Sequence, residues 1–431
     1  MRETALANGL GTDFLQTDSI RLFITDLDSL KATDYASIAD VNSDGPTPAA
    51  DSLTANLVLR CATLEHLLTQ GYLKLCTALA FGIADPYRLL GEACYGTKSL
   101  RPDHDFAERA LEAAADDKAA DFIADVAPRS KLYRKLSDGI DTLSGDALRL
   151  RQLNLERLRW HRNRTMNDGD RWVFVNVAAR QLWARNADST LQMRVVCGTT
   201  STRTPLLESR ISSIQVNPVW NIPYNIVKTD IMGHAGDSAY FTRHRYYVTD
   251  DDSERLINPA TVTAAQFASG HYHVKQEGGP GNSLGRLKFN FPNPYSVYLH
   301  DTSNKPAFQQ ERRLLSHGCV RVQHPLDLAL LLLDYPDEWT TDRMRIAIGQ
   351  QPLGERGKKW LAETERTDEE KMQLSRYAKV EQVPVAIDYF TLLPDPITGE
   401  GLNTWPDVYG YDKILWRAIK PFATSAVKEQ K

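Results

Sequence analysis

The sequence predicts an α+β protein in which a helical N-terminal domain precedes a β-rich domain that carries a long insertion. Three observations support this prediction. Apolar residues recur at three- and four-residue spacing early in the chain, β-branched and alternating segments follow from Arg171 onward, and residues of about 228–285 show few strand signals. A chain of 431 residues also exceeds the usual size of one domain, which is about 100–200 residues.

The composition is that of an ordinary globular protein, with 42% hydrophobic and 25% charged residues. A net charge of −4 lacks the basic surface that nucleic acids require, so we expect no nucleic-acid partner. The sequence contains no apolar run of about 18 residues or more, which a membrane-spanning helix would need. The first residues contain no apolar stretch typical of a secretory signal, so the residues alone leave the compartment open.

The first part of the chain reads as a polar segment followed by a helical domain. Residues 1–50 are polar and end in the turn-rich run 42–48. Residues 51–165 are assigned to the helical domain, in which Asp103 or Asp105 would open the Ala-rich second helix. The expected helices are Leu53–Phe81, Phe106–Val126, Ser130–Leu136 and Gly145–Arg159.

The pattern changes to short strands in residues 166–350, which we assign to a second domain. Residues 351–431 are expected to be a C-terminal segment that packs on this domain. The expected strands are Arg171–Ala178, Gln181–Arg185, Leu191–Cys197, Arg210–Val216, Phe289–Pro294, Val297–His300, Arg343–Ile348 and one or two within Val383–Leu393. Helices are expected at Pro325–Leu333 and Asp412–Ile419.

Five cysteines leave at least one free thiol. Cys61, Cys76 and Cys94 fall in one apolar helical region. We expect these cysteines to be buried and to pack as small hydrophobic residues, rather than to form a disulfide. Cys197 ends a strand-like run and is expected in the core. Cys319 lies in a polar motif and is the candidate for chemistry.

That motif is Ser316-His-Gly-Cys-Val-Arg321, with His300 one short loop upstream. A thiol is mostly protonated at neutral pH, and a neighbouring imidazole can accept its proton and activate it as a nucleophile. Gly318 allows close backbone approach, so the N–H groups of Gly318 and Cys319 are candidates to face a developing oxyanion. The motif therefore indicates acyl transfer through Cys319.

The motif resembles the active site of the L,D-transpeptidases, cysteine enzymes that cross-link bacterial peptidoglycan. The resemblance extends over most of the chain from about Leu153 and includes the C-terminal signature of the large periplasmic branch. Three further segments carry it, namely Gln215–Pro223, Gly285–Asp301 and Trp405–Asp412. The resemblance implies a helical scaffold domain before a catalytic domain with a lid at about 228–285. The family's inserted peptidoglycan-binding module is missing, because only residues 137–146 occupy its place.

The resemblance implies a two-step reaction on peptidoglycan stem peptides. Cys319 would form a thioester with a donor tetrapeptide and release its terminal D-amino acid, and a diamino-acid side-chain amine of an acceptor stem would then take the acyl group. Hydrolysis by an L,D-carboxypeptidase or endopeptidase, exchange with a free D-amino acid, and capture by a lipoprotein lysine would use the same thioester. A non-catalytic wall-binding protein is the alternative from another class, against which the complete motif argues.

Residue roles follow in part from the motif and in part from the resemblance. His300 is our choice of general base, with the main-chain carbonyl of Asp301 holding the ring, while His317 remains the alternative proton acceptor. Ser316 is expected to hydrogen-bond locally and hold the turn. Arg321 suits a carboxylate of the stem peptide, or a structural salt bridge.

The resemblance also implies the surroundings of this site. The candidates for lining the groove are Tyr298, Trp220, Asn221 and Tyr224, each of which is equally compatible with plain packing. No cofactor or metal is expected, because His271 and His273 have no nearby cysteine or carboxylate cluster. The expected location is the periplasm, with roles in cell-wall biogenesis and cell shape, sensitivity to carbapenems, and wall-synthesis or remodelling proteins as partners. The sequence leaves the oligomeric state open.

Overall fold

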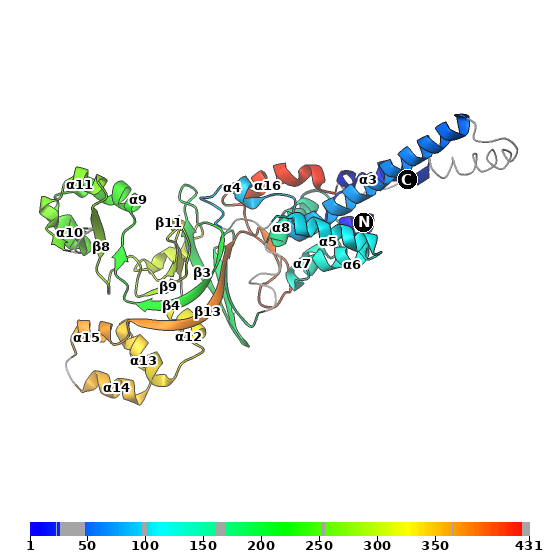
Figure 1. Ribbon diagram of the computed structural model, residues 1–431. Coiled ribbons are helices and arrows are strands. Elements are labelled where there is room, and N and C mark those ends of the chain that lie inside the picture. Colours follow the sequence, from blue (N-terminus) through cyan, green and yellow to red (C-terminus); the bar gives the residue numbers. More distant parts are fainter. Residues whose placement is uncertain are drawn as a thin grey trace. The chain divides into compact units, whose positions relative to one another are not determined.

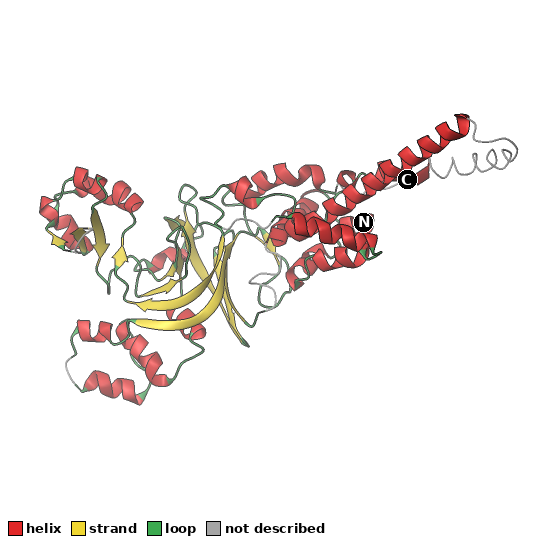
Figure 2. Cartoon of the chain, viewed as in Figure 1, coloured by secondary structure: helices red, strands yellow, loops and turns green. Residues whose placement is uncertain are grey.

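The computed structural model describes residues 1–22, 24–25, 48–96, 101–160, 169–250, 255–363 and 366–424 (Figure 1). The chain forms two compact units, one of Met1–Asp168 with Phe390–Lys431 and the other of Gly169–Tyr389. Helices make up most of the first unit and the large sheet lies in the second (Figure 2). Most of the polar segment (26–47) and the boundary expected near residue 165 lie outside the described residues.

The first unit is built on the long helix α3 (Pro48–Phe81), whose C-terminal half supplies much of a buried apolar cluster. The expected single helix at 106–126 is two helices, because the chain turns at Asp117, which has a positive φ of 59°. Asp103 caps the first of these by accepting the N–H of Phe106. The helices are α1 (Arg2–Ala7), α4 (Pro86–Leu90), α5 (His104–Ala115), α6 (Ala119–Val126), α7 (Lys131–Ser137) and α8 (Gly145–Trp160), with short η1 (Asp13–Leu15) and η2 (Ile140–Thr142).

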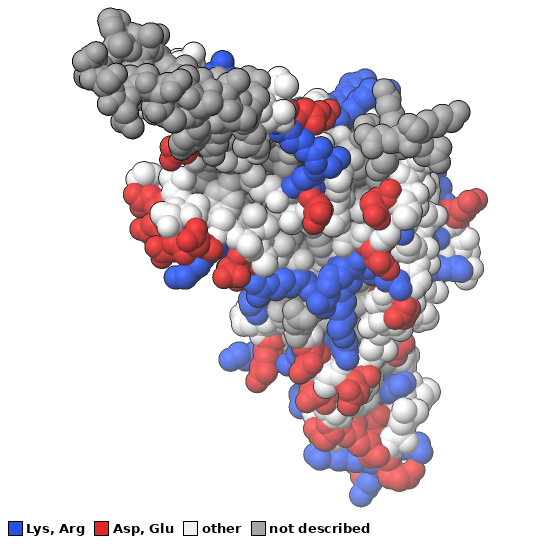
Figure 3. Space-filling model, turned by 90° about the vertical axis from the view of Figure 1, so that its right-hand side faces the viewer, with Lys and Arg blue, Asp and Glu red and all other residues white. Residues whose placement is uncertain are grey.

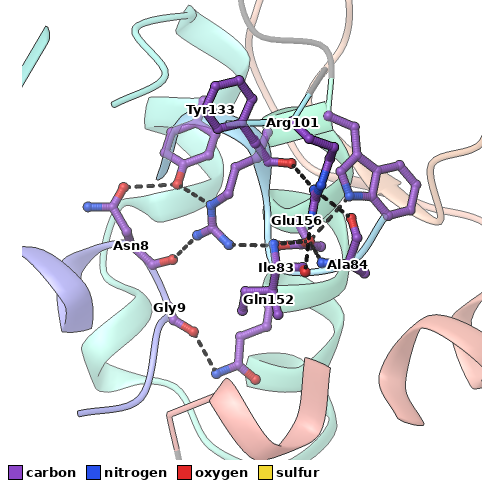
Figure 4. A network of polar contacts seen from close by, with 11 residues as sticks. Asn8, Gly9, Ile83, Ala84, Arg101, Tyr133, Gln152 and Glu156 are labelled. Carbon is purple, nitrogen blue, oxygen red and sulfur yellow. Dashed lines mark hydrogen bonds and ion pairs between the residues drawn. The ribbon is translucent and has the colours of Figure 1, made fainter. Parts of the chain in front are cut away.

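A buried polar network around Glu156 of α8 ties this unit together (Figure 4). The Glu156 carboxylate accepts the main-chain N–H groups of Ile83 at 2.6 Å and Ala84 at 2.8 Å, just after the end of α3. It also pairs with Arg159 at 3.1 Å. Arg159 donates to the Tyr133 hydroxyl at 3.1 Å and to a main-chain carbonyl near the N-terminus. One fully buried carboxylate therefore joins the segment after α3 to α8, and Arg159 extends the network to Tyr133 and to the N-terminal segment.

The C-terminal segment does not pack as the sequence analysis predicted. Residues from Phe390 belong to the helical unit, and only the part before them belongs with the large sheet. Helix α8 explains this arrangement, because its buried Arg157 pairs with Asp412 at 2.5 Å and its Asn154 accepts the N–H of Thr391 at 3.0 Å. The elements of this segment are β14 (Leu392–Leu393), β15 (Asn403–Thr404), α16 (Tyr411–Ile419) and η7 (Lys420–Phe422).

The second unit contains a nine-stranded sheet in the order β11-β3-β12-β10-β9-β4-β13-β1-β2. Strands β2 and β3 also pair, which closes the sheet on itself. Most of the buried residues of these strands are Val, Leu, Ile and Phe, and in β1 all residues after Arg171 are buried, as expected for a strand covered on both faces. The strands are β1 (Arg171–Asn176), β2 (Gln181–Asn186), β3 (Ser189–Gly198), β4 (Leu207–Val216), β9 (Leu287–Asn290), β10 (Leu299–His300), β11 (Leu314–Ser316), β12 (Val320–Val322) and β13 (Tyr377–Asp388), and η6 (Lys305–Gln309) precedes β11.

The insertion between β4 and β9 has its own sheet and core, although its sequence showed few strand signals. We call residues 220–276 the lid. Its four strands pair in the order β5-β8-β6-β7, and Phe241, Phe267 and Val274 are among its buried core residues. The elements are β5 (Trp220–Asn221), α9 (Tyr224–Ile226), η3 (Val227–Ile231), η4 (Met232–His234), α10 (Ser238–His244), β6 (Tyr246–Asp250), β7 (Leu256–Ile257), η5 (Pro259–Thr261), α11 (Ala264–Ala268) and β8 (Tyr272–Gln276).

The strand predicted at Arg343–Ile348 is wrong, because these residues lie mainly in helix α13 (Glu338–Ala347). Asp337 caps this helix by accepting the N–H of Thr340. Asp342 of the same helix is buried and accepts the N–H groups of Leu353 and Gly354. The neighbouring helices are α12 (Pro325–Leu332), α14 (Glu355–Ala362) and α15 (Asp368–Gln373).

All five cysteines are free thiols. Cys76 and Cys197 are fully buried, as predicted, whereas Cys61 is exposed. On the face that Figure 3 shows, acidic and basic side chains are interspersed, in keeping with the small net charge of −4. Among the described residues, no helix is long and apolar enough to cross a membrane.

Replacing Glu156 should destabilise the helical unit strongly. In Glu156→Ala, two main-chain N–H groups and the Arg159 guanidinium lose their buried acceptor, which costs about 3–5 kcal/mol. We expect this loss in the free energy of unfolding, measured by chemical denaturation with helical circular dichroism. Arg129→Ala, which breaks an exposed pair with Asp125, is the control and should cost under about 1 kcal/mol. Equal effects of the two variants would contradict the assigned role of Glu156.

Candidate active site

The position of the candidate residues is set by two parallel strands. In β10 and β12, Leu299 lies opposite Val320, and His300 lies opposite Arg321. Cys319 directly precedes β12, and the N–H of Val320 donates to the Tyr298 carbonyl at 3.2 Å. The pairing therefore places the thiol beside Tyr298, with His300 two residues further along the same strand.

The turn before Cys319 depends on Ser316 and Gly318. The Ser316 hydroxyl accepts the N–H of Gly318 at 3.2 Å and donates to the Cys319 carbonyl at 2.5 Å. Gly318 has φ of +121°, a conformation that side-chain-bearing residues rarely adopt. Because its N–H is already bonded to Ser316, Gly318 does not present this N–H to an oxyanion as the sequence analysis expected, and the N–H of Cys319 remains from that pair.

The thiol opens into a pocket of about 280 Å³ at the junction of the lid and the sheet. Of the residues singled out from the sequence, this pocket is lined by Cys319, His300, His317, Arg321, Ser316, Tyr298 and Trp220. Other lining residues come from the lid, among them Pro223, Asn225 and Ile226. The candidate nucleophile, both imidazoles and a guanidinium therefore line one pocket.

Three candidates lie outside this lining. Gly318 is buried within the turn. Asn221 follows Trp220 on strand β5 and is exposed, because successive residues of a strand point to opposite faces. Tyr224 is 50% exposed, and its hydroxyl donates to the Ala268 carbonyl at 3.5 Å, within the lid. The structure therefore does not bring Asn221 and Tyr224 to the pocket.

The imidazole of His300 is buried in a positive environment. Burial, and then the charges of Arg321 and Lys288, lower its pKa to about 3, while the main-chain groups of Asp301 and Leu284 oppose this shift. The Nδ1 atom is buried with no hydrogen-bond partner of normal geometry. The Asp301 carboxylate does not assist the ring, because it accepts the N–H groups of Arg286 and Thr302 and pairs with Lys305.

The thiol is also held in its neutral form. Burial raises the pKa of Cys319, whereas the N–H of Tyr298, the charges of Lys288 and Arg321, and the Tyr298 hydroxyl oppose the rise. The thiol donates to the Ser296 carbonyl at 3.8 Å. Within the described part of the chain, no hydrogen bond joins Cys319 to His300. Burial therefore favours the neutral thiol of Cys319 and the neutral imidazole of His300.

The lid contacts the Ser316–Arg321 motif through Asp230 of η3. Its carboxylate lies 3.7 Å from Nε2 of His317, and both side chains are about half exposed, at 49% and 44%. His317 thus faces the lid at the mouth of the pocket, whereas His300 is buried beneath it. Sequence reasoning missed Asp230, because nothing local distinguishes this residue from other polar residues of the insertion.

Sequence reasoning also missed Lys288. This residue lies on β9 opposite His300, and its Nζ is 4.1 Å from the centre of the Tyr298 ring. The segment Leu287–Asn290 alternates, and its polar positions read as ordinary solvent-facing residues. Only the pairing with β10, which the sequence does not show, places Lys288 near the thiol.

Two other features carry no comparable chemistry. A larger hollow of about 1050 Å³ in the helical unit is lined mainly by exposed residues of mixed charge, such as Lys131, Arg134 and Asp138, with no cysteine or histidine. Among the described residues, no group of three or more His, Cys, Asp or Glu side chains is arranged to hold a metal ion. His273 pairs across β8 and β6 with Thr249.

The lowered pKa of His300 makes stability depend on pH. Between pH values of about 3 and 6.5, the folded chain binds fewer protons at His300 than the unfolded chain does. Stability contributed by this residue is therefore complete above about pH 6.5 and falls as the pH decreases, by up to about 1.4 kcal/mol per unit. We expect urea unfolding at pH 7 and pH 5 to show a larger loss for the natural chain than for His300→Gln. Equal losses would contradict the assignment.

The contact between Asp230 and His317 should restrain the lid. In Asp230→Asn the carboxylate partner of His317 is removed, and we expect faster hydrogen–deuterium exchange in residues 224–234. The increase should be about fivefold or less, because an exposed pair contributes under about 1 kcal/mol. Lys228→Gln, which changes an exposed charge on the same turn, should leave exchange unaltered. Unchanged exchange in Asp230→Asn would show that the contact does not restrain the lid.

Comparisons with known proteins agree with the two units. Residues 170–337 match the family described as the L,D-transpeptidase catalytic domain, and residues 17–139 match the family described as the scaffold domain. A protein of Haemophilus influenzae named "Putative L,D-transpeptidase" is 29% identical over 339 residues, which cover 75% of this chain and 63% of that protein. The predicted fold class is confirmed, and the two units are similar to the L,D-transpeptidase catalytic domain and to the scaffold domain.

Proposed function

We propose that this protein is a peptidoglycan L,D-transpeptidase that works through a thioester on Cys319. The observation that carries the proposal is the parallel pairing of β10 and β12, which sets Cys319, Tyr298, His300 and Arg321 around one pocket. The Haemophilus influenzae relative supports the same reading, although this chain spans only 63% of its length. The whole activity, its substrates and its location are therefore part of the proposal.

In the first step, the Cys319 sulfur attacks the carbonyl between the third and fourth residues of a donor tetrapeptide. A C–S bond forms and the peptide C–N bond breaks. His300 takes the thiol proton and passes it to the leaving amine, which departs as a D-amino acid. The Cys319 N–H is our candidate to stabilise the oxyanion, because the N–H of Gly318 is bonded to Ser316.

In the second step, a side-chain amine of a diamino acid on an acceptor stem attacks the thioester. A C–N bond forms, the C–S bond breaks, and the proton lost by the amine returns through His300 to the thiolate. No cofactor takes part in either step. Capture of the thioester by water or by another amine differs only in the second nucleophile.

The electrostatics of the pocket give substrate binding a role in activation. With a pKa of about 3, His300 is a weak base. Burial is the largest cause of this lowered pKa, and the charge of Arg321 is the next. A substrate carboxylate beside Arg321 would offset that charge and raise the pKa of His300. A stem peptide that pairs with Arg321 therefore strengthens the base that the reaction requires.

The location and inhibitors follow from the substrate. We place the protein in the periplasm, where peptidoglycan is cross-linked. We expect roles in cell-wall biogenesis and cell shape. The expected protein partners are wall-synthesis or remodelling proteins. A carbapenem carries a strained carbonyl that the same thiol can attack, so Cys319 is the expected site of a covalent adduct.

Replacing Cys319 tests the reaction directly. Disaccharide-tetrapeptide muropeptides incubated with the protein should give dimers joined between two third-position diamino acids, identified by mass spectrometry. Cys319→Ala should give no dimer and no carbapenem adduct, because the nucleophile is missing. Cys61→Ser, which alters an exposed thiol of the helical unit, is the matched control and should retain both.

Other products would redirect the proposal. Tripeptides alone, formed only when Cys319 is present, would establish hydrolysis in place of transfer. Dimers from Cys319→Ala, or the absence of both product and carbapenem adduct from the natural chain, would contradict the thioester mechanism.

A further inference from the structure

Lys288 is a half-buried cation with no assigned role. It lies on β9 between two strands, opposite His300 of β10 and Gln215 of β4. Its ammonium group rests over the Tyr298 ring, 4.1 Å from the ring centre. Burial lowers the pKa of Lys288, because a desolvated ammonium group is less stable than a hydrated one, while the charge of Cys319 opposes this shift. A lysine in this position calls for an explanation beyond solubility.

Tyr298 connects this cation to the thiol. Tyr298, Trp220 and Cys319 line the same pocket, and the Tyr298 carbonyl accepts the N–H of Val320, the residue after Cys319, at 3.2 Å. Burial raises the pKa of Cys319, and the N–H and the hydroxyl of Tyr298 are among the groups that oppose this rise. Lys288 itself does not line the pocket, so the Tyr298 ring separates it from the substrate space.

Two physical effects favour a negative sulfur in this arrangement. A cation over an aromatic face is attracted to the ring and withdraws electron density from it, which makes the attached hydroxyl a stronger donor. The charge also acts through a poorly screened interior, where Coulomb interactions weaken slowly with distance. Both effects act on the thiolate and leave the neutral thiol nearly unaffected.

We propose that Lys288 is a positioning residue that stabilises the Cys319 thiolate through Tyr298. This proposal rests on the function proposed above only in that Cys319 is the nucleophile. Arg321 is the other cation near the sulfur, but it lines the pocket and is available to a substrate carboxylate. Lys288 therefore supplies positive charge that substrate binding does not consume.

The first experiment measures the thiolate without any peptidoglycan. The rate at which iodoacetamide alkylates Cys319 is followed across pH by peptide mass spectrometry, which separates Cys319 from the other thiols. Lys288→Met should move the midpoint of this profile upward by about one pH unit, because a nearby opposite charge is lost. Lys288→Arg should keep the midpoint of the natural chain. Lys379→Met, an exposed lysine on β13 of the same sheet, should also leave it unchanged.

The second experiment tests the route through Tyr298. In Tyr298→Phe the hydroxyl donor is absent, so adding Lys288→Met should shift the midpoint much less than it does in the natural chain. An equal shift in both backgrounds would overturn the route through Tyr298. An unchanged midpoint in Lys288→Met, or a shift in Lys288→Arg as large as in Lys288→Met, would overturn the role of the charge.

Folding and function are controlled separately. Each variant is checked by thermal melting, and Lys288→Gln replaces Lys288→Met if the latter fails to fold. Dimer formation from muropeptides is measured in parallel. A shifted alkylation profile in a chain that makes no dimers would support the role of Lys288 while contradicting the transpeptidase. Normal dimer formation with an unshifted alkylation profile would support the transpeptidase while contradicting the role of Lys288.

Discussion

The parallel pairing of β10 with β12 is the constraint on which the site depends. The two strands are only two and three residues long, yet their register fixes which side chains stand beside the sulfur. Strand β9 on one side and β3 on the other hold this pair within the large sheet. The geometry of the site is thus set by the main-chain hydrogen bonds of the large sheet.

Burial and two nearby cations act on both Cys319 and His300. The same burial that keeps the thiol protonated also keeps the imidazole neutral, so neither group is activated in isolation. Lys288 and Arg321 favour the thiolate and disfavour the imidazolium. When a proton moves from Cys319 to His300, the two cations therefore favour the thiolate that forms and disfavour the imidazolium. One of them, Arg321, lines the pocket. Burial thus disfavours the charged form of both residues.

The sequence was sufficient for the fold class, for most strands of the large sheet, and for the motif around Cys319. Prediction from the sequence failed where residues far apart in the chain decide the local structure or the contacts. Residues 343–348 read as a strand because isoleucines alternate, whereas the cap at Asp337 and the contacts of Asp342 make them helical. The C-terminal segment joined the helical unit because of Arg157, a partner more than two hundred residues away. Asn221 was assigned to the groove although it lies one strand position from Trp220, and Lys288 was passed over because strand pairing is invisible in a single sequence.

The size of the pocket has a consequence for the order in which substrates arrive. A space of about 280 Å³ is small even for a small-molecule pocket. Under the proposed function, it would hold the reacting part of one stem peptide while the glycan strands stay outside. The first leaving group would then depart before an acceptor amine approaches the thioester. Water competes with that amine for the same thioester, so its access to this pocket would decide how often a stem is transferred and how often it is only trimmed.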